Sequence, residues 1–181
     1  MFDEPVTDVW LEIGFGGGEH LAAQARANGQ IGMLGAEPYI NGIAKLLSTI
    51  DREALANIRI HPDDARELLE QLPDQSLGAV FILFPDPWPK ARHNKRRFIN
   101  ADNLAQIARV LRPGGRLRFA SDITDYVRWT LVHVRAARCF EWTAGRAADW
   151  RQRPGDWPAT RYEAKAIRQG REPSYLQFIR L

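Results

Sequence analysis

The stretch FPDPWPKARHNKRRF, at residues 84–98, gathers one acid, one tryptophan and a run of basic side chains. Pro85 and Pro87 restrict the backbone on both sides of Asp86, so its carboxylate is aimed with little conformational entropy left to lose. Trp88 offers a flat face on which a base can stack. Side chains that can contact phosphates follow, with no acid among them: Lys90, Arg92, His93, Asn94, Lys95, Arg96 and Arg97. This set favours a ligand with a planar base and several phosphates, meaning RNA or DNA, over a small metabolite.

Plainer interpretations of this stretch stay open at the level of sequence. PDPW can be only a rigid turn, and residues 90–97 can be a solvated charge run. Trp88 by itself is more often a packing residue than a stacking platform. The net charge of +3 does not decide between these interpretations, because it is a mild bias for a chain of 181 residues.

A glycine cluster, LEIGFGGGE at residues 11–19, follows the first apolar run of the chain. Glycines at such a turn let a ligand approach the N-terminus of a helix, and three of them alternate here: Gly14, Gly16 and Gly18. A dinucleotide fingerprint requires glycine at position 19, where this chain has Glu19. Glu12, at the end of the predicted strand, suits an ammonium or sulfonium group and repels a pyrophosphate. The cluster therefore disfavours a nicotinamide enzyme.

Two more acids follow the next two predicted strands. Glu37 stands where an acid that accepts hydrogen bonds from ribose hydroxyls is expected, and Asp64 can accept from an adenine amino group. With Glu12 they line the carboxyl edge of an open sheet, and they fit a nucleoside with a positively charged tail, S-adenosylmethionine. Asp64 can equally be the N-cap of a helix at 65–72, and Asp63 competes with it for either role.

Short apolar runs that alternate with amphipathic stretches predict the scaffold that positions these residues. Strands are predicted at 9–13, 31–38, 57–61, 77–84 and 116–121. Helices are predicted at about 19–27, 39–50, 65–72, 99–111 and 123–137. This alternation predicts an α/β protein, a doubly wound Rossmann-like parallel sheet with helices on both faces. The polar stretch 143–160 is too long for an ordinary loop and separates two more strand candidates, 139–142 and 174–181.

Composition places the chain among ordinary globular proteins, with 45% hydrophobic and 26% charged residues. Its length and the absence of a linker-like segment predict one domain, 1–181. Cys139 is the single cysteine and cannot form an internal disulfide, while the four histidines are too scattered to indicate a metal site. The sequence has no signal-peptide pattern and no apolar run of about 20 residues. We therefore expect a cytoplasmic protein that uses no metal and contacts no membrane.

Several motifs resemble, in order and spacing, those of a known family. Six segments are similar to segments of the bacterial tRNA (guanine-N7-)-methyltransferases: LEIGFGGGEHL, GAEPY, DDARELL, FPDPWPKARHNKRRF, FASD and TRYE. PDPWPK followed by RHNKRR is the most specific of them, and the resemblance runs over essentially the whole chain. It implies methyl transfer from S-adenosyl-L-methionine to N7 of guanine 46 in the tRNA variable loop. It also implies the class I methyltransferase fold, a seven-stranded, mostly parallel sheet whose last strand is antiparallel.

The resemblance assigns roles residue by residue. The cofactor-binding positions of the family match Glu12, Glu37, Asp64 and Asp86, and Asp86 also matches the catalytic position. The substrate-binding positions match Lys90, Asp122, Thr160, Arg161, Tyr162 and Glu163, and the basic run 92–97 matches the segment that contacts tRNA. Thr160 and Glu163 are also spaced as a capping box, so a purely structural role stays open for them.

Two rival functions remain at this stage. One is a methyltransferase that acts on another substrate, and salt-sensitive tRNA binding would argue against it. The other is an RNA-binding module on an inactive methyltransferase fold. The intact acids at positions 12, 37, 64 and 86 argue against that module, because an inactive site has no reason to keep them.

Overall fold

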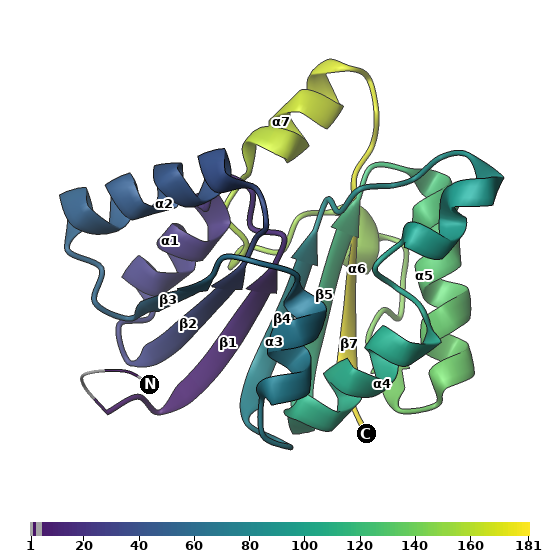
Figure 1. Cartoon of the computed structure of the whole chain (residues 1–181). Coiled ribbons are helices and arrows are strands. Elements are labelled where there is room, and N and C mark those ends of the chain that lie inside the picture. Colours follow the sequence, from purple (N-terminus) through teal and green to yellow (C-terminus); the bar gives the residue numbers. More distant parts are fainter. Residues whose placement is uncertain (1, 3–4) are drawn as a thin grey trace.

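Seven strands form one sheet in the order β3-β2-β1-β4-β5-β7-β6 (Figure 1). The computed structural model describes residue 2 and residues 5–181. The strands are β1 (Asp8–Ile13), β2 (Ile31–Ala36), β3 (Ile58–His61), β4 (Leu77–Leu83), β5 (Leu111–Ser121), β6 (Phe140–Trp142) and β7 (Ser174–Arg180). Strands β1 to β5 pair in parallel, whereas β7 runs antiparallel to both of its neighbours, β5 and β6. The predicted sheet with an antiparallel last strand is confirmed.

Helices cover both faces of this sheet (Figure 1). They are α1 (Glu19–Ala27), α2 (Ile40–Glu53), α3 (Ala65–Gln71), α4 (Ala101–Val110), α5 (Thr124–Ala137), α6 (Ala148–Arg151) and α7 (Arg161–Arg168), with a short 3₁₀ helix, η1 (Ala91–Arg96). Helices α3, α4 and α5 pack on one face, against strand residues such as Leu11 and Val80. Helices α1 and α2 pack on the other face, against Met33 and Ile58. None of the described helices is long and apolar enough to cross a membrane.

The polar stretch 143–160 covers the rest of the second face. It contains α6 and ends in a buried anchor, Trp157, which packs in one apolar cluster with Phe81 of β4 and Tyr175 of β7. The rings of Trp157 and Tyr175 meet edge to face, with their centres 5.8 Å apart. The segment is therefore held against the sheet by its own aromatic residue.

Local sequence explains where most elements begin and end. Every residue of β4 is buried, as a central strand requires. Side chains of Asp64, Asn100 and Thr160 cap α3, α4 and α7. The strand predicted at 116–121 begins earlier, at Leu111, because pairing with β4 starts before the RPGG segment and resumes after it in a shifted register.

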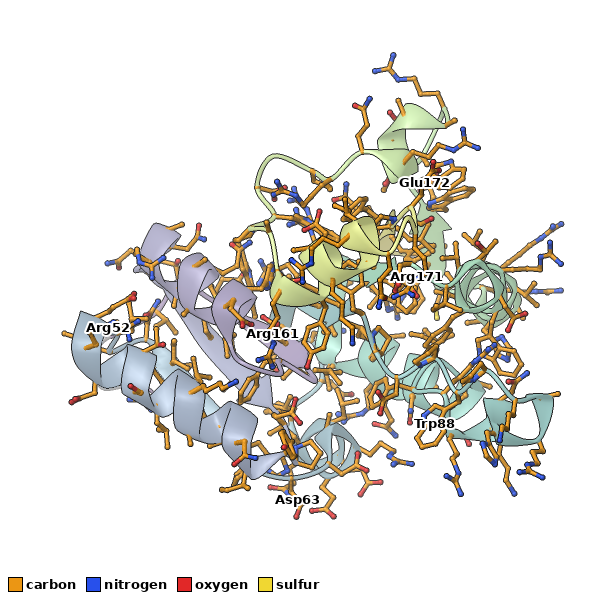
Figure 2. All side chains as sticks on the ribbon, turned by 90° about the horizontal axis from the view of Figure 1, so that it is seen from above. Arg52, Asp63, Trp88, Arg161, Arg171 and Glu172 are labelled. Carbon is orange, nitrogen blue, oxygen red and sulfur yellow. The ribbon has the colours of Figure 1, made fainter. Side chains whose placement is uncertain are left out.

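The carboxyl ends of β1 to β5 meet at one edge of the sheet, the upper edge in Figure 1, and α7 lies above it. Figure 2 looks down on this edge. The acids that follow the strands, the glycine cluster and the PDPW stretch all belong to it. Within the described part of the chain, no group of three or more His, Cys, Asp or Glu side chains is placed to hold a metal ion.

Candidate active site

The loop between β1 and α1 is shaped by glycines in a left-handed conformation. Gly14, Gly16 and Gly18 have φ angles of 69°, 58° and 78°, which residues with a side chain rarely adopt. Two close approaches hold the loop against α2. A Cβ on Gly18 would lie 2.6 Å from Leu46, and a Cβ on Gly42 would lie 2.0 Å from the carbonyl oxygen of Gly16. A Cβ on Gly14 would meet nothing within 4 Å, so the loop is open to a ligand at that point.

Glu37 joins the glycine loop to the start of α2. One oxygen of its carboxylate accepts a hydrogen bond from the backbone N–H of Gly16 at 2.8 Å. The other accepts from the backbone N–H of Tyr39 at 2.9 Å. The residue is buried, yet each oxygen retains a lone pair for a further hydrogen bond. Its place at the end of β2 fits the predicted acceptor for ribose hydroxyls.

Asp64 caps α3, one of the two roles that the sequence leaves open. Its carboxylate accepts from the backbone N–H of Arg66 at 2.9 Å and pairs with the guanidinium of the same residue. The hydrogen bond from that guanidinium holds the pKa of Asp64 below its usual value, although partial burial acts in the opposite direction. Asp63 lies exposed beside it (Figure 2), and its carboxylate accepts from the N–H of Asp64.

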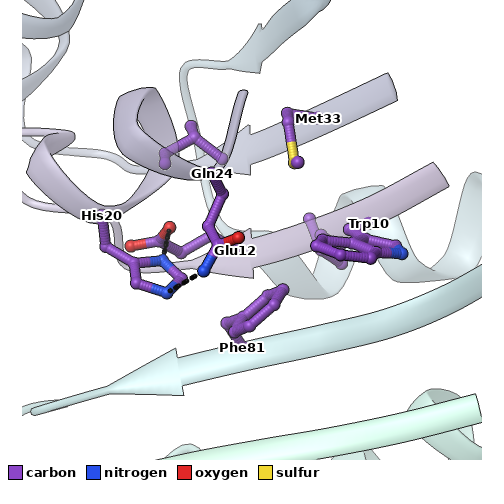
Figure 3. Close-up of a pocket in the computed structure, with 8 residues that line it drawn as sticks. Trp10, Glu12, His20, Gln24, Met33 and Phe81 are labelled. Atoms are coloured by element: carbon purple, nitrogen blue, oxygen red, sulfur yellow. Dashed lines mark hydrogen bonds and ion pairs between the residues drawn. The ribbon is translucent and has the colours of Figure 1, made fainter. Parts of the chain in front are cut away.

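Glu12 is only 4% exposed, and its carboxylate contacts His20 (Figure 3). Its Oε2 lies 2.7 Å from Nδ1 of His20. Nε2 of the same ring lies 3.3 Å from the side-chain nitrogen of Gln24, which also donates to the backbone carbonyl of Asp156 at 2.7 Å. This chain of contacts assigns the ring proton to Nδ1 and leaves Nε2 as the acceptor. His20 thus engages Oε2 of Glu12, and the predicted contact between this carboxylate and a cationic ligand stays a prediction.

The space around this polar chain is closed by apolar side chains. Trp10, Met33 and Phe81 line the remaining gap, which is too narrow to admit a water molecule (Figure 3). Neither His20 nor Gln24 is among the residues that the sequence predicts for the site. The available signal is their spacing of four residues on the buried face of the helix that follows the glycine loop.

Arg118 of β5 ties the segment 143–160 to the sheet. Its guanidinium pairs with Asp156 at 2.7 Å and lies over the rings of Phe81 and Trp157, 5.6 and 5.5 Å from their centres. Burial lowers the pKa of Arg118, and the hydrogen bond with Asp156 opposes that shift. Because Asp156 also receives the hydrogen bond from α1, the segment is joined to the same polar chain.

Asp86 lies exposed just beyond the carboxyl end of β4. It forms no hydrogen bond or ion pair with any described residue. The backbone around it is strained, because Phe84 and Trp88 have φ angles of 52° and 43°. Each such residue costs on the order of 1–3 kcal/mol, and strain of this kind is concentrated at functional sites. The stretch thus presents an acid without a partner on a rigid backbone.

Trp88 is half-buried and is covered in part by the basic run that follows it. The guanidinium of Arg96 lies 4.8 Å from the centre of its ring, and the ring of His93 meets it edge to face at 6.0 Å. Asn94 is also half-buried, and its Oδ1 has no partner among the described residues. The exposed cations of the run form no ion pair with a described acid, and they are Lys90, Arg92, Lys95 and Arg96.

Arg97 departs from the predicted row of phosphate contacts, because it is only 1% exposed. Its guanidinium pairs with Asp125 at 2.5 Å and donates from Nε to the carbonyl of Pro87 at 2.9 Å. The rings of Tyr126 and Trp129 lie 4.9 and 5.1 Å from it. Burial raises the pKa of Tyr126 to about 12, so its ring is neutral at physiological pH. In this conformation the Arg97 side chain is buried, and the contact with a phosphate that the sequence predicts for it stays a prediction.

The remaining predicted residues lie on or beside α7. Thr160 and Glu163 form the capping box that the sequence predicts, and the carboxylate of Glu163 also accepts from the hydroxyl of Tyr175 at 2.5 Å. Burial, followed by this contact with the Glu163 carboxylate, raises the pKa of Tyr175. Asp122, at the end of β5, pairs with Arg171 at 2.5 Å.

Two exposed residues of α7 reach the glycine loop. The ring of Tyr162 would lie 3.0 Å from a Cβ on Gly16. The guanidinium of Arg161 lies 3.5 Å from the carboxylate of Glu19, at the start of α1 (Figure 2). Helix α7 therefore brings the TRYE segment, which lies far along the chain, beside the glycine cluster.

Comparisons with known proteins agree with this geometry. Residues 6–175 match a protein family described as "Putative methyltransferase". A tRNA (guanine-N(7)-)-methyltransferase of Mesorhizobium japonicum is 54% identical over 99% of this chain and 77% of its own length. Proteins of the same name from Rhodospirillum rubrum and Ruegeria pomeroyi are 54% and 58% identical, over 99% and 96% of this chain and 71% and 73% of their own lengths.

Solved structures give the same fold at low sequence identity. The 16S rRNA methyltransferase KamB superposes with a TM-score of 0.68 and 17% identity, over 97% of this chain and 89% of that chain. The aminoglycoside resistance methyltransferase NpmB1 superposes with a TM-score of 0.64 and 17% identity, over 98% and 89%. At this level of identity the likeness shows the fold alone.

Proposed function

The chain belongs to the tRNA (guanine-N7-)-methyltransferase family, and from that premise we propose that it methylates N7 of guanine 46 in the tRNA variable loop. The methyl donor is S-adenosyl-L-methionine, and the product is 7-methylguanosine. One observation of the site carries this proposal. Asp86 is exposed at the end of the central strand and has no partner among the described residues, and the exposed cations that follow it in sequence have no acidic partner there either. The whole chain, 1–181, acts as one methyltransferase domain.

The residues at the ends of β1 to β3 fit the donor. The backbone is open at Gly14, and buried Glu37 has lone pairs left for ribose hydroxyls. Asp64 combines its capping role with a place at the same edge, where it can accept from the adenine amino group. Glu12 contributes indirectly, because its contact with His20 fixes α1 beneath the glycine loop. When bound, the donor supplies a methyl group already activated on a sulfonium.

The substrate residues fit a base and its phosphates. Guanine N7 carries a lone pair and no proton, so the protein does not need a general base at that atom. Asp86 accepts hydrogen bonds from the guanine N1–H and amino group, which orients the ring and stabilises the positive charge that develops on it. The exposed cations of 90–96 and the Arg161 and Tyr162 side chains of α7 contact the tRNA. Asp122, Thr160 and Glu163 shape this surface through the contacts described above.

Nucleoside analysis tests the proposed function. The protein is incubated with methyl-labelled S-adenosyl-L-methionine and an unmodified tRNA, and with a matched tRNA in which adenine replaces guanine 46. The label is expected in 7-methylguanosine from the first tRNA and is expected to be lost with the second. Salt-sensitive tRNA binding without methyl transfer would instead indicate an RNA-binding module. Binding of S-adenosyl-L-methionine without binding or methylation of either tRNA would indicate another substrate.

A further inference from the structure

The guanidinium of Arg97 lies in a cage formed by Asp125, Tyr126 and Trp129 of α5. This cage connects the PDPW stretch with the segment that follows η1. On one side Arg97 donates to the carbonyl of Pro87, which belongs to the peptide bond that precedes strained Trp88. On the other side, two aromatic residues of α5 that enclose the guanidinium also bind the backbone of Ile99. The hydroxyl of Tyr126 accepts from the N–H of Ile99 at 3.3 Å, and Nε1 of Trp129 donates to its carbonyl at 2.6 Å.

This cage leaves no part of the guanidinium for a phosphate. The side chain of Arg97 has no exposed surface, and its positive charge is paired with Asp125, whose own side chain is 69% exposed. The one nitrogen without a hydrogen bond, Nη1, is itself buried. Releasing Arg97 toward a phosphate would leave the Pro87 carbonyl and the Asp125 carboxylate without their partner. The contacts therefore separate Arg97 from Arg96, its exposed neighbour in sequence.

The planar shape of arginine suits this place. A guanidinium can donate in two directions from one plane while both of its faces lie against aromatic rings, which a lysine ammonium cannot do. The cation lies over the rings of both Tyr126 and Trp129, and Tyr126 is neutral and fully buried. The arrangement fixes the direction of the peptide next to Asp86 before any substrate is bound.

We propose that Arg97 is a positioning residue for the methyl transfer: it holds the Pro87–Trp88 peptide and so aims Asp86 at the guanine. Phosphate contacts then come from the exposed cations of the same run. The inference rests on the proposed function, because it assigns Arg97 a role in that reaction. It replaces the role of phosphate ligand that the sequence predicts for this arginine.

Two variants separate the roles, one that keeps the positive charge and one that removes it. Arg97→Lys keeps the positive charge but loses the planar set of N–H donors, so kcat is expected to fall about tenfold to a hundredfold. Its affinity for S-adenosyl-L-methionine and the salt dependence of its tRNA affinity are expected to stay unchanged. Arg96→Gln is expected to raise the KM for tRNA and to make the slope of log affinity against log salt shallower by about 0.7 to 0.9. Arg52→Gln, an exposed arginine of α2 far from this run (Figure 2), is the control and should alter neither quantity.

Asp125, the acid that pairs with Arg97, provides a second test that leaves the buried arginine in place. Asp125→Asn is expected to loosen the cage and lower kcat several-fold. If Arg97 were a phosphate ligand, the same substitution would free its charge, and tRNA binding would tighten with no loss of kcat. A wild-type kcat for both Arg97→Lys and Asp125→Asn overturns the inference. Wild-type protein that forms no 7-methylguanosine would instead overturn the proposed function, so the two failures are distinguishable.

Discussion

Two ends of the same sheet edge differ in how their charged groups are satisfied. At the cofactor end, formed by the ends of β1, β2 and β3, each acid has a partner inside the protein. Glu12 contacts His20, Glu37 accepts from two backbone N–H groups, and Asp64 pairs with Arg66. At the substrate end, formed by residues 85–97, Asp86 and the exposed cations have no acidic or basic partner among the described residues.

The difference indicates that the two ends are prepared in different ways. The cofactor end is assembled before its ligand arrives, and one of its acids, Glu37, holds the glycine loop through the N–H of Gly16. The substrate end leaves its charges unpaired among the described residues, as the proposed binding of a large polyanion requires. Its rigidity comes from prolines, a strained backbone and one buried arginine. Substitutions at the two ends should therefore affect different ligands.

The largest effect is expected at the substrate end. Asp86→Ala should lower kcat by about 10² to 10³-fold, because a group aimed at the developing charge is removed. Affinity for S-adenosyl-L-methionine, measured by calorimetry, should remain close to that of the wild type. Glu70→Ala, which removes an exposed acid of α3, serves as the control. Unchanged turnover in the Asp86 variant would remove this residue from the reaction, and a matching loss of donor affinity would place it in both ends.

The next effect is expected at the cofactor end. Glu37→Ala should weaken the binding of S-adenosyl-L-methionine by about 10- to 100-fold, because hydrogen bonds to a charged group are each worth about 1.5–3 kcal/mol. The tRNA affinity of the same variant should not change. Glu53→Ala, at the far end of α2, is the matched control. An equal loss of affinity for S-adenosyl-L-methionine and for tRNA would show that the two ends are not independent.

Stability should also distinguish the ends. His20→Leu leaves the buried carboxylate of Glu12 without its partner, so the free energy of unfolding should fall by about 1–3 kcal/mol. Lys95→Ala removes an exposed cation of the substrate end and should change the free energy of unfolding by less than about 0.5 kcal/mol. Denaturant titrations of both variants provide the measurement. A His20 variant as stable as the wild type would show that the contacts among Glu12, His20 and Gln24 do not stabilise the fold.

The smallest effect is expected at α7, which lies between the two ends. Thr160→Ala removes the cap of this helix and should cost about 1 kcal/mol of unfolding free energy. Thr160→Ser retains the hydroxyl and should recover most of that loss. Hydrogen exchange at the amides of α7 reports the same change locally. Equal exchange in the alanine variant and the wild type would contradict a structural role for the capping box.

The sequence predicts the scaffold well, because its signals are local. Alternating apolar runs, glycine turns and caps define the strands and helices, and their bounds agree with the structure within three residues, except for the start of β5. The acids after β2, β3 and β4 also lie at the edge that the parallel order predicts. In each case the relevant residues are neighbours along the chain or follow directly from strand order.

The surroundings of Arg97 and Glu12 depend on contacts between distant elements, which the sequence does not show. Nothing within RHNKRR separates Arg97 from Arg96, since the cage is supplied by Asp125, Tyr126 and Trp129 on a later helix. In the same way, the partner of Glu12 becomes evident only when α1 is packed against β1. A charge in a sequence shows what a residue can bind, and tertiary packing decides which partner it has.

The most direct test of this division measures the salt dependence of both ligands on the wild-type protein. The slope of log affinity against log salt should be about −4 for tRNA, since the four exposed cations of 90–96 and Arg161 of α7 contribute about 0.7 to 0.9 each. The slope for S-adenosyl-L-methionine should be close to zero, because the cofactor end is already satisfied internally. A flat tRNA slope, or equal slopes for both ligands, would contradict the account.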